Sequence, residues 1–413
     1  MRQRLTLFRD RIAHHPAAAY LTDPRVITAL FAIAAIAAGV GEILKGPKDY
    51  LGVDYPRYNN FLIFKHSFYN LLAGKDLYIA HPDLFFDFYK YSPGFALLMG
   101  PLAILPDVPG LLLWNLLNAV PLVLAIWLIP HLDRRQRIII AWLVLLELFT
   151  SLQNSQSNGL LAGLFLLAFV AFERERPVWA ALALTTTVFV KLFGLAFFPL
   201  MLLYPGKRRF FLAAAGFAAL FTLAPLLVVS PGHLLELHRS WVALLGSDQS
   251  VSYGISVMGI LESWSGWTPP QLLLIGIGAA VTYAPLLRLT NYGRPVFRRL
   301  FFAALLIWVV IFNHKAESPT FVIAMCGIAL WYVSGTAGWW RRGALIGAFL
   351  LVSLSPTDLF PGRLRNGLVR PFKLKALPAV AIWIWGQVEM WRLDRRGGTR
   401  SAVANGRQAG ANP

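Results

Sequence analysis

Charged residues are scarce in this sequence, and acidic residues are the scarcest of them. Asp, Glu, Lys and Arg together make up 14% of the 413 residues, whereas 57% are hydrophobic. Soluble globular domains carry about 25% charged residues, so the composition excludes an ordinary soluble enzyme and indicates a polytopic membrane protein. The chain has one cysteine, Cys326, which excludes an intrachain disulfide and a cysteine-based metal cluster.

Motifs that handle nucleotide phosphates are also missing. The sequence has no Asp-x-Asp motif and no glycine-rich phosphate loop, and the nearest candidate, Gly276-Ile-Gly278, lies within an apolar run. His233 and His238 are five residues apart without a third ligand, which is a poor pattern for zinc. We therefore predict no cofactor and no metal site, and leave the question of a metal requirement open.

Long apolar runs, by contrast, are abundant. A membrane-crossing helix needs about 20 apolar residues, and ten runs approach that length: 26–44, 109–130, 138–152, 158–173, 208–230, 270–289, 299–313, 317–334, 343–355 and 376–392. Three shorter runs, 93–106, 178–189 and 193–204, are expected to be half-spanning or re-entrant helices inside the bundle. These runs predict an all-α integral membrane domain over 1–393, followed by a disordered cytoplasmic tail over 394–413.

The distribution of basic residues predicts the orientation of the chain. Lys and Arg number 38 against 20 Asp and Glu, giving a net charge of +18. Most of them fall in the N-terminal segment, in alternate short loops and in the tail, and cytoplasmic loops retain such charge. Both termini are therefore expected in the cytoplasm of a cell-membrane protein, with the long loops 45–92, 231–269 and 356–375 outside. The expected partners include membrane lipids, and nucleic acid is not needed to explain the charge.

The first outer loop contains an amphipathic pattern over 59–74. Its apolar residues fall on one helical stripe: Phe61, Phe64, Phe68, Leu71 and Leu72. Lys65 lies elsewhere on the helical wheel, and Gly74 is expected to end the helix. Such a helix either lies on the membrane surface or packs on the bundle. The aromatic stretch 85–91 is typical of a membrane-interface belt, with lipid-chain or sugar contact as the alternative.

A series of short motifs follows in order along the chain. They are Tyr58, Asp76-Leu77-Tyr78, Tyr91-Ser92-Pro93, Trp114, Gln156-x-Asn158 and Lys191 within an apolar hairpin. Over about 50–335 this order resembles glycosyltransferase family 87. The resemblance implies an integral membrane enzyme of the GT-C fold that takes a polyprenyl-phosphate sugar, often mannose, as donor.

The sequence departs from the family pattern at the position of an expected acid. In that register this chain has Asn60, which cannot act as a base, and the nearest carboxylate is Asp54. Ser155 and Leu192 also stand where family members tend to have Gly and Pro. These departures leave the identity of the general base open.

The expected chemistry requires a carboxylate on the outer side. Because no nucleotide-sugar pool exists there, the donor must be carried by a lipid phosphate, and direct displacement needs a base for the acceptor hydroxyl. The candidates are Asp54, which could equally be a solvated loop residue or helix cap, and Glu317. Glu317 lies in the polar turn 313–319, where an ion-paired turn is the alternative.

Other polar residues are candidates for substrate binding. Lys191 at membrane depth suits a phosphate contact or snorkelling to the interface, and Gln156 and Asn158 suit sugar hydroxyls or helix capping. Tyr58, Asn60, Lys65, Tyr91, His314 and Lys315 complete the set of loop and turn candidates. Arg363 and Arg365 belong to a basic cluster in 356–375 that suits either the donor phosphate or lipid head groups.

Together these observations predict a membrane hexosyltransferase, resembling mannosyltransferases, that moves a sugar from a polyprenyl-phosphate donor to a glycan or lipid acceptor at the outer face. The main alternative is a transporter or flippase of lipid-linked sugars. Alternating access usually leaves two related halves with matching broken helices, and the breaks near 93–106 and 191 have no counterparts later in the chain. A non-catalytic scaffold is the third class considered.

Overall fold

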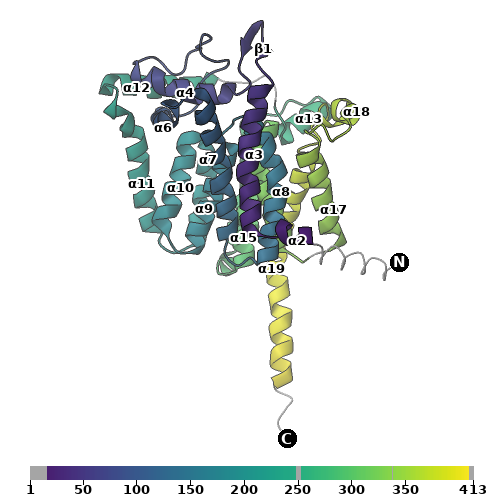
Figure 1. The fold of residues 1–413 in the computed structure, drawn as a ribbon. Coiled ribbons are helices and arrows are strands. Elements are labelled where there is room, and N and C mark those ends of the chain that lie inside the picture. The colour runs from purple at the N-terminus through teal and green to yellow at the C-terminus, as the bar shows by residue number, and fades with distance from the viewer. Residues whose placement is uncertain (1–15, 248–252, 337, 409–413) are drawn as a thin grey trace. The chain divides into compact units, whose positions relative to one another are not determined.

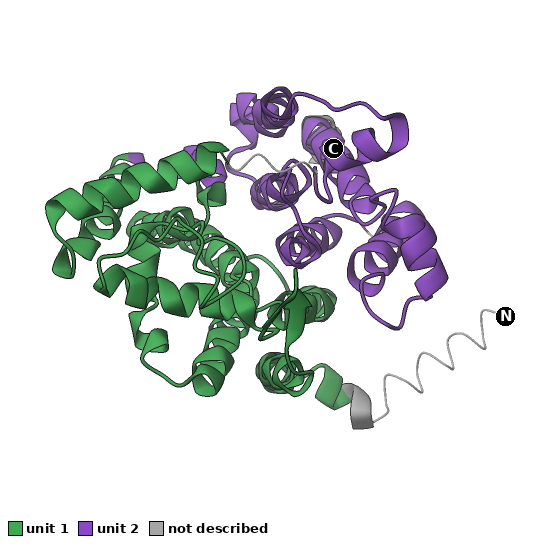
Figure 2. Ribbon diagram, turned by 90° about the horizontal axis from the view of Figure 1, so that it is seen from above, with its two compact units in different colours: residues 1–195, 208–249 green, residues 196–207, 250–413 purple. Residues whose placement is uncertain are grey.

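The computed structural model describes residues 16–247, 253–336 and 338–408, with side chains over 19–393 apart from the gaps. The chain divides into two compact units. Unit 1 comprises residues 1–195 and 208–249, and unit 2 comprises residues 196–207 and 250–413 (Figure 2). Both are helical, and the two strands form one small hairpin.

Unit 1 is a bundle of long helices. After the short α2 (Pro16–Leu21), it contains α3 (Pro24–Leu44), α7 (Asp107–Leu128), α8 (Arg134–Gln153), α9 (Asn158–Glu173), α10 (Pro177–Val190) and α11 (Lys207–Leu223), which runs on into η2 (Ala224–Leu227). α7 packs against α3 and α9, and α10 packs against α9. Helix starts follow the local sequence: Asp133 caps α8 in a capping box with Gln136, and Asp23 caps α3 before Pro24.

Two glycines bring α9 into backbone contact with α7. A Cβ on Gly159 would lie 2.6 Å from the carbonyl oxygen of Asn118, and a Cβ on Gly163 would lie 3.0 Å from the nitrogen of Leu122. This four-residue spacing of small residues is the usual way for membrane helices to approach closely. It fixes the start of α9, where Asn158 lies.

Smaller elements gather at one end of this bundle (Figure 1). They are the hairpin β1 (Lys48–Tyr50) and β2 (Val53–Tyr55), the helices α4 (Asn59–Leu72), α5 (Pro93–Leu98) and α6 (Gly100–Ala103), and α12 (Pro231–Ser247). α4 packs against α5, α6 and α7 with Phe61, Phe64 and Leu71 fully buried, while Leu72 is 47% exposed. Of the two expectations for the 59–74 stripe, packing on the bundle is therefore observed, and Gly74, at φ 63°, follows the end of the helix.

The hairpin was not predicted. Its turn residues Leu51 and Gly52 have φ values of 57° and 86°, the left-handed conformation that a two-residue hairpin turn requires at both positions. Only Gly52 indicates such a turn in the sequence, because leucine rarely adopts this conformation. The strands pair Lys48 with Tyr55, Asp49 with Asp54 and Tyr50 with Val53.

Unit 2 is built around two helices whose side chains are nearly all buried, α15 (Pro295–Ile311) and α16 (Phe321–Ser334). Around them are η1 (Leu192–Leu203), which begins in unit 1, α13 (Val257–Ser265), α14 (Gln271–Tyr283), η3 (Ala284–Leu287), η4 (Leu289–Asn291), η5 (Ser318–Thr320), α17 (Trp339–Ala348), η6 (Phe349–Leu354), α18 (Gly362–Leu364), η7 (Arg365–Val369) and α19 (Leu377–Gln408). Arg341 of α17 is 5% exposed and pairs with Glu389 of α19, which also accepts a hydrogen bond from Trp331 of α16. The ion pair and this hydrogen bond together join three helices.

The predicted apolar runs all coincide with helices or with helices and their short extensions. Among the described residues, four are long and apolar enough to cross a membrane: Pro24–Leu44, Asp107–Leu128, Arg134–Gln153 and the combined segment Lys207–Leu227. The helical, membrane-type fold is therefore confirmed, whereas the number of about ten spans stays a prediction. Helices also form within the expected loops 231–269 and 356–375. The expected tail begins inside α19 and ends outside the described residues, so its disorder stays a prediction.

Candidate functional site

The turn between α8 and α9 is the centre of a polar network in unit 1. Ser155 adopts φ 50°, and its carbonyl accepts a hydrogen bond from the indole of Trp114 in α7 at 2.8 Å. Asn60 of α4 donates its amide to the carbonyl of Asn154, also at 2.8 Å. Trp114 and Asn60 therefore hold the turn from two sides. Asn60 is the residue at the position where the family pattern has an acid.

Three of the predicted binding residues meet at this turn. The ammonium of Lys191 donates to Asn158 Oδ1 at 2.9 Å, and Asn158 Nδ2 donates to Gln156 Oε1 at 2.6 Å. Asn158 is fully buried, whereas Lys191 and Gln156 are half-buried. Lys191 has extended backbone (φ −144°, ψ 136°) because α10 ends there. The lysine is thus fixed at a helix end by a buried amide, which orients its charge.

The Tyr91-Ser92-Pro93 motif is tied to the same region. Ser92 caps α5 and donates its hydroxyl to the carbonyl of Phe189, two residues before Lys191, at 2.7 Å. The hydroxyl of Tyr78 donates to the carbonyl of Tyr91 at 2.9 Å, and that of Tyr89 to the carbonyl of Ser92 at 2.8 Å. Burial raises the pKa of Tyr78 and of Tyr89 above the usual tyrosine value, so both hydroxyls stay protonated and able to donate.

An aromatic cluster links this motif to α4 and α7. The Tyr91 ring lies 4.9 Å from that of Phe64 and 5.4 Å from that of Phe95, and Phe64 lies 5.1 Å from Trp114. Edge-to-face and tilted ring pairs at these distances are favourable. The half-buried Tyr91 is the member that is accessible for contact with a ligand.

Asp54, a candidate base, lies away from this network. It is exposed on β2, directly opposite Asp49 of β1. Successive residues of a strand face opposite sides, so both carboxylates point away from the hairpin face on which Tyr50 stacks against Phe86 at 4.7 Å. Within the described residues, the carboxylate of Asp54 has no hydrogen bond or ion pair.

Lys65, Tyr58 and His66 lie at the contact between α4 and the start of α7. Lys65 is nearly buried and donates to Asp107 and to the carbonyl of Leu105, both at 2.7 Å, so it ties α4 to the start of α7. Tyr58 precedes α4, and its pKa is raised by burial and by the charge of Asp107. Burial lowers the pKa of His66, although Asp107 opposes the shift.

In unit 2, the predicted turn 313–319 is compact and polar. The side chain of Asn313 accepts from the backbone nitrogen of Lys315 at 3.0 Å, and the carbonyl of Ala316 accepts from the backbone nitrogen of Ile255 at 2.7 Å. His314 and Lys315 are half-buried beside them, and Glu317 is exposed just before η5. Lys375, which is 4% exposed, enters this turn and donates to the hydroxyl and carbonyl of Ser318 at 2.7 and 3.1 Å.

The basic cluster of the last loop is divided by the fold. Arg363 is exposed, whereas Arg365 donates to Asp358 at 3.3 Å and to the carbonyl of Thr357 at 2.9 Å. Lys375 is committed to Ser318. Among the described residues, no group of His, Cys, Asp and Glu side chains could hold a metal ion, and His233 pairs with Glu236 at 3.5 Å.

Comparison with known proteins identifies the family. The family model of glycosyltransferase family 87 matches residues 88–312, more than half of the chain. The chain belongs to glycosyltransferase family 87. A search of the curated proteins gives no match.

Membership of glycosyltransferase family 87 makes the protein a glycosyltransferase, acting on a sugar donor and an acceptor, and confirms the resemblance found in the sequence. The matched region contains Tyr91, Trp114, Gln156, Asn158 and Lys191, the residues that the network of unit 1 connects. Asp54 and Asn60 precede it, and Glu317 follows it. The family match thus covers these five residues, but not Asn60, and leaves both candidate bases outside.

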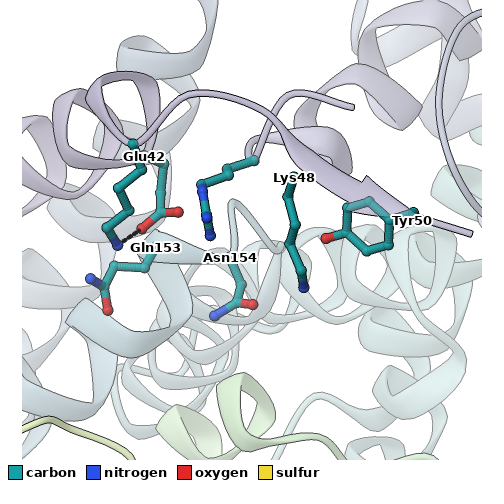
Figure 3. A pocket seen from close by; sticks show the side chains of 7 residues that line it. Glu42, Lys48, Tyr50, Gln153 and Asn154 are labelled. Atoms are coloured by element: carbon teal, nitrogen blue, oxygen red, sulfur yellow. Dashed lines mark hydrogen bonds and ion pairs between the residues drawn. The ribbon is translucent and has the colours of Figure 1, made fainter. Parts of the chain in front are cut away.

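Sequence reasoning missed a polar pocket in unit 1. It has a volume of about 200 Å³ and is lined by Glu42, Lys45, Lys48, Tyr50, Arg57, Gln153 and Asn154 (Figure 3). In this view Glu42 and Gln153 lie on one side, Lys48 and Tyr50 on the other, and Asn154 between them. Three cations close together in a loop expected outside, where basic residues are depleted, are the pattern that could have revealed it.

Proposed function

We propose that this glycosyltransferase moves a hexose, mannose or a similar sugar, from a polyprenyl-phosphate donor to a glycan or lipid acceptor at the outer face of the cell membrane, in a GT-C-type fold with both termini in the cytoplasm. The hydrogen-bonded series from Lys191 through Asn158 to Gln156 carries the proposal. It combines a cation that suits a phosphate with an amide that suits a sugar hydroxyl.

In this proposal Lys191 binds the phosphate of the donor and stabilises the negative charge that forms when the sugar leaves. A preorganised cation next to the leaving group stabilises the transition state more than the ground state. Asn158 holds the ammonium in place, and Gln156 orients the sugar through its amide. Tyr91 provides an aromatic surface for the sugar ring or the first prenyl unit.

The reaction is a displacement at the anomeric carbon. A carboxylate takes the proton of the acceptor hydroxyl, the acceptor oxygen bonds to the anomeric carbon from the face opposite the phosphate, and polyprenyl phosphate departs with the bonding electrons. The anomeric centre is inverted. Asp54 and Glu317 are the proposed bases, and both are exposed to solvent in their own units.

The remaining candidates have narrower proposed roles. Tyr58, His314 and Lys315 are proposed to contact the acceptor or donor from their half-buried positions. Arg363 is proposed to bind anionic groups because it is exposed, with Arg365 held by Asp358. Asn60 and Lys65 support the site through the contacts already described.

The proposal is tested by supplying radiolabelled polyprenyl-phosphate mannose to proteoliposomes with a panel of glycan and lipid acceptors. We expect label to appear in an acceptor, and Lys191→Gln to abolish most of it while Lys75→Gln, an exposed lysine of the first loop, does not. Label that crosses the bilayer without transfer would instead indicate a flippase.

The base is assigned by comparing Asp54→Asn with Glu317→Gln at equal expression. Loss of transfer in one variant, while the other variant stays active, identifies the base. Full activity in both removes both candidates.

A further inference from the structure

The pocket of unit 1 contains more positive charge than its surroundings require. Lys45, Lys48 and Arg57 line it, and Glu42 is the one carboxylate among its lining residues. Glu42 is already paired with Lys45 at 2.6 Å. Two cations, Lys48 and Arg57, therefore remain without a carboxylate in the pocket.

Within the described residues, the side chains of these two cations make no hydrogen bond and no ion pair. The Nε of Arg57 is buried without a hydrogen-bond partner there, and a buried donor of this kind is costly unless a ligand satisfies it. The ammonium of Lys48 lies 4.6 Å from the centre of the Tyr50 ring, a contact that leaves its hydrogen-bonding capacity unused. Both side chains are therefore available to an anion.

The other lining groups suit the same type of ligand. Gln153 contributes a neutral amide at the end of α8, whereas the amide nitrogen of Asn154 already donates to the carbonyl of Thr150 at 2.9 Å. The pocket volume of about 200 Å³ is several times that of a water molecule, about 30 Å³. Guanidinium groups bind phosphate in a bidentate manner, and lysine binds it as a point charge. A phosphate group would satisfy Arg57 and Lys48 together.

A structural explanation competes with this one. α3 ends at Leu44 and α8 ends at Gln153, and cations near helix C-termini are stabilising. Cations with that role can donate to the last carbonyl groups, but Lys45 donates to Glu42 instead. Neither Lys48 nor Arg57 donates to a helix carbonyl among the described residues. The contacts therefore favour an anion over helix capping.

We infer that the pocket lined by Lys48, Arg57, Gln153 and Asn154 is a phosphate-binding site, separate from Lys191. The phosphate is either the head group of a membrane lipid or free in solution. This site goes beyond the proposed transfer reaction, because binding there requires no sugar. It adjoins the turn that positions Gln156 and Asn158, since Asn154 belongs to both.

The test measures binding to the full chain in phosphatidylcholine nanodiscs without any sugar donor. One arm titrates inorganic phosphate, and a second titrates a short-chain prenyl phosphate. Because Lys191 is itself proposed to bind a phosphate, each arm compares Lys191→Gln alone with Lys191→Gln combined with Arg57→Gln, with Lys48→Gln or with the control Lys75→Gln. Unfolding midpoints are recorded for all variants.

We expect the Lys191→Gln background and its Lys75→Gln combination to bind alike. Arg57→Gln in that background should bind about tenfold or more weakly, because a charged hydrogen bond to the phosphate is lost. Binding in both arms indicates free phosphate, and binding of the prenyl phosphate alone indicates a lipid head group. Lys48→Gln, a change on an exposed strand, tests the same site if Arg57→Gln does not fold.

The inference is overturned if neither probe binds to Lys191→Gln, or if binding to Lys191→Gln is unchanged when Arg57→Gln or Lys48→Gln is added. It is also overturned if these two combinations lose stability while binding phosphate as Lys191→Gln alone does, because the cations would then act as helix caps. Since no transfer is measured, failure here leaves the proposed glycosyl transfer untouched.

Discussion

Each unit has a polar turn to which a lysine donates hydrogen bonds, and the two lysines differ in how deeply they are buried. In unit 1 the turn before α9 receives Lys191, and in unit 2 the turn before α16 receives Lys375. Lys375 is 4% exposed, makes two hydrogen bonds to Ser318 and lies over the Phe321 ring at 5.0 Å. Lys191 is half-buried and anchored to Asn158. Lys375 is therefore a buried structural contact, whereas the partial exposure of Lys191 is compatible with its proposed role in phosphate binding.

The comparison is tested most strongly by removing the ammonium of unit 1. We expect Lys191→Gln to lower sugar transfer by about 100-fold or more, because the loss of one charge-stabilising group in an active site has effects of that size. Turnover of radiolabelled donor in proteoliposomes measures it, with the unfolding midpoint as a check of folding. Transfer at the wild-type rate would make Lys191 as structural as Lys375.

The matching change in unit 2 should affect stability instead. Lys375→Met keeps much of the length of the side chain but leaves the hydroxyl and carbonyl of Ser318 without their donor, at a cost of about 1–3 kcal/mol. The unfolding midpoint should fall, while transfer per folded molecule stays near the wild-type value. A large loss of transfer with unchanged stability would place Lys375 in the binding machinery.

A third change sharpens the difference within unit 1 itself. Asn60→Asp introduces the acid expected at this register but removes the amide that donates to the carbonyl of Asn154. We expect it to destabilise the protein by about 1 kcal/mol and not to raise transfer. If Asn60→Asp raises transfer, and adding Asp54→Asn to it does not lower transfer, then an acid at position 60 can act as the base.

The smallest expected effect is on pH dependence. Burial lowers the pKa of His66 below its ordinary value of about 6.5, so the folded state disfavours its protonation. Stability linked to this group is present above that pH and is lost as the pH falls through the lowered pKa. The unfolding midpoint, followed from about pH 8 to about pH 4.5, should fall less steeply in His66→Gln. Parallel profiles would exclude His66 as the cause.

The sequence predicted the helices and the network better than the loops. Apolar runs identify helices because length and periodicity are local properties, and the motifs around Tyr91, Gln156 and Lys191 follow from the family order. The contact of Asn60 with Asn154 joins residues far apart in the chain, which no local pattern reveals. The hairpin depends on Leu51 in a left-handed conformation, against the preference of that residue. The pocket was missed because its cations, Lys45, Lys48 and Arg57, are joined there by Gln153 and Asn154 from a distant part of the chain.

The polar network depends on Gly159 and Gly163 of α9, which pack against the backbone of α7. Asn158 directly precedes Gly159, whose backbone contacts α7. A single methyl group added at Gly159 or Gly163 would push the head of this helix sideways. Asn158, which accepts the hydrogen bond of Lys191, would shift with the helix, although the substitution removes no polar atom of the site. The position of the Lys191 ammonium thus depends on how closely the backbones of α7 and α9 approach each other.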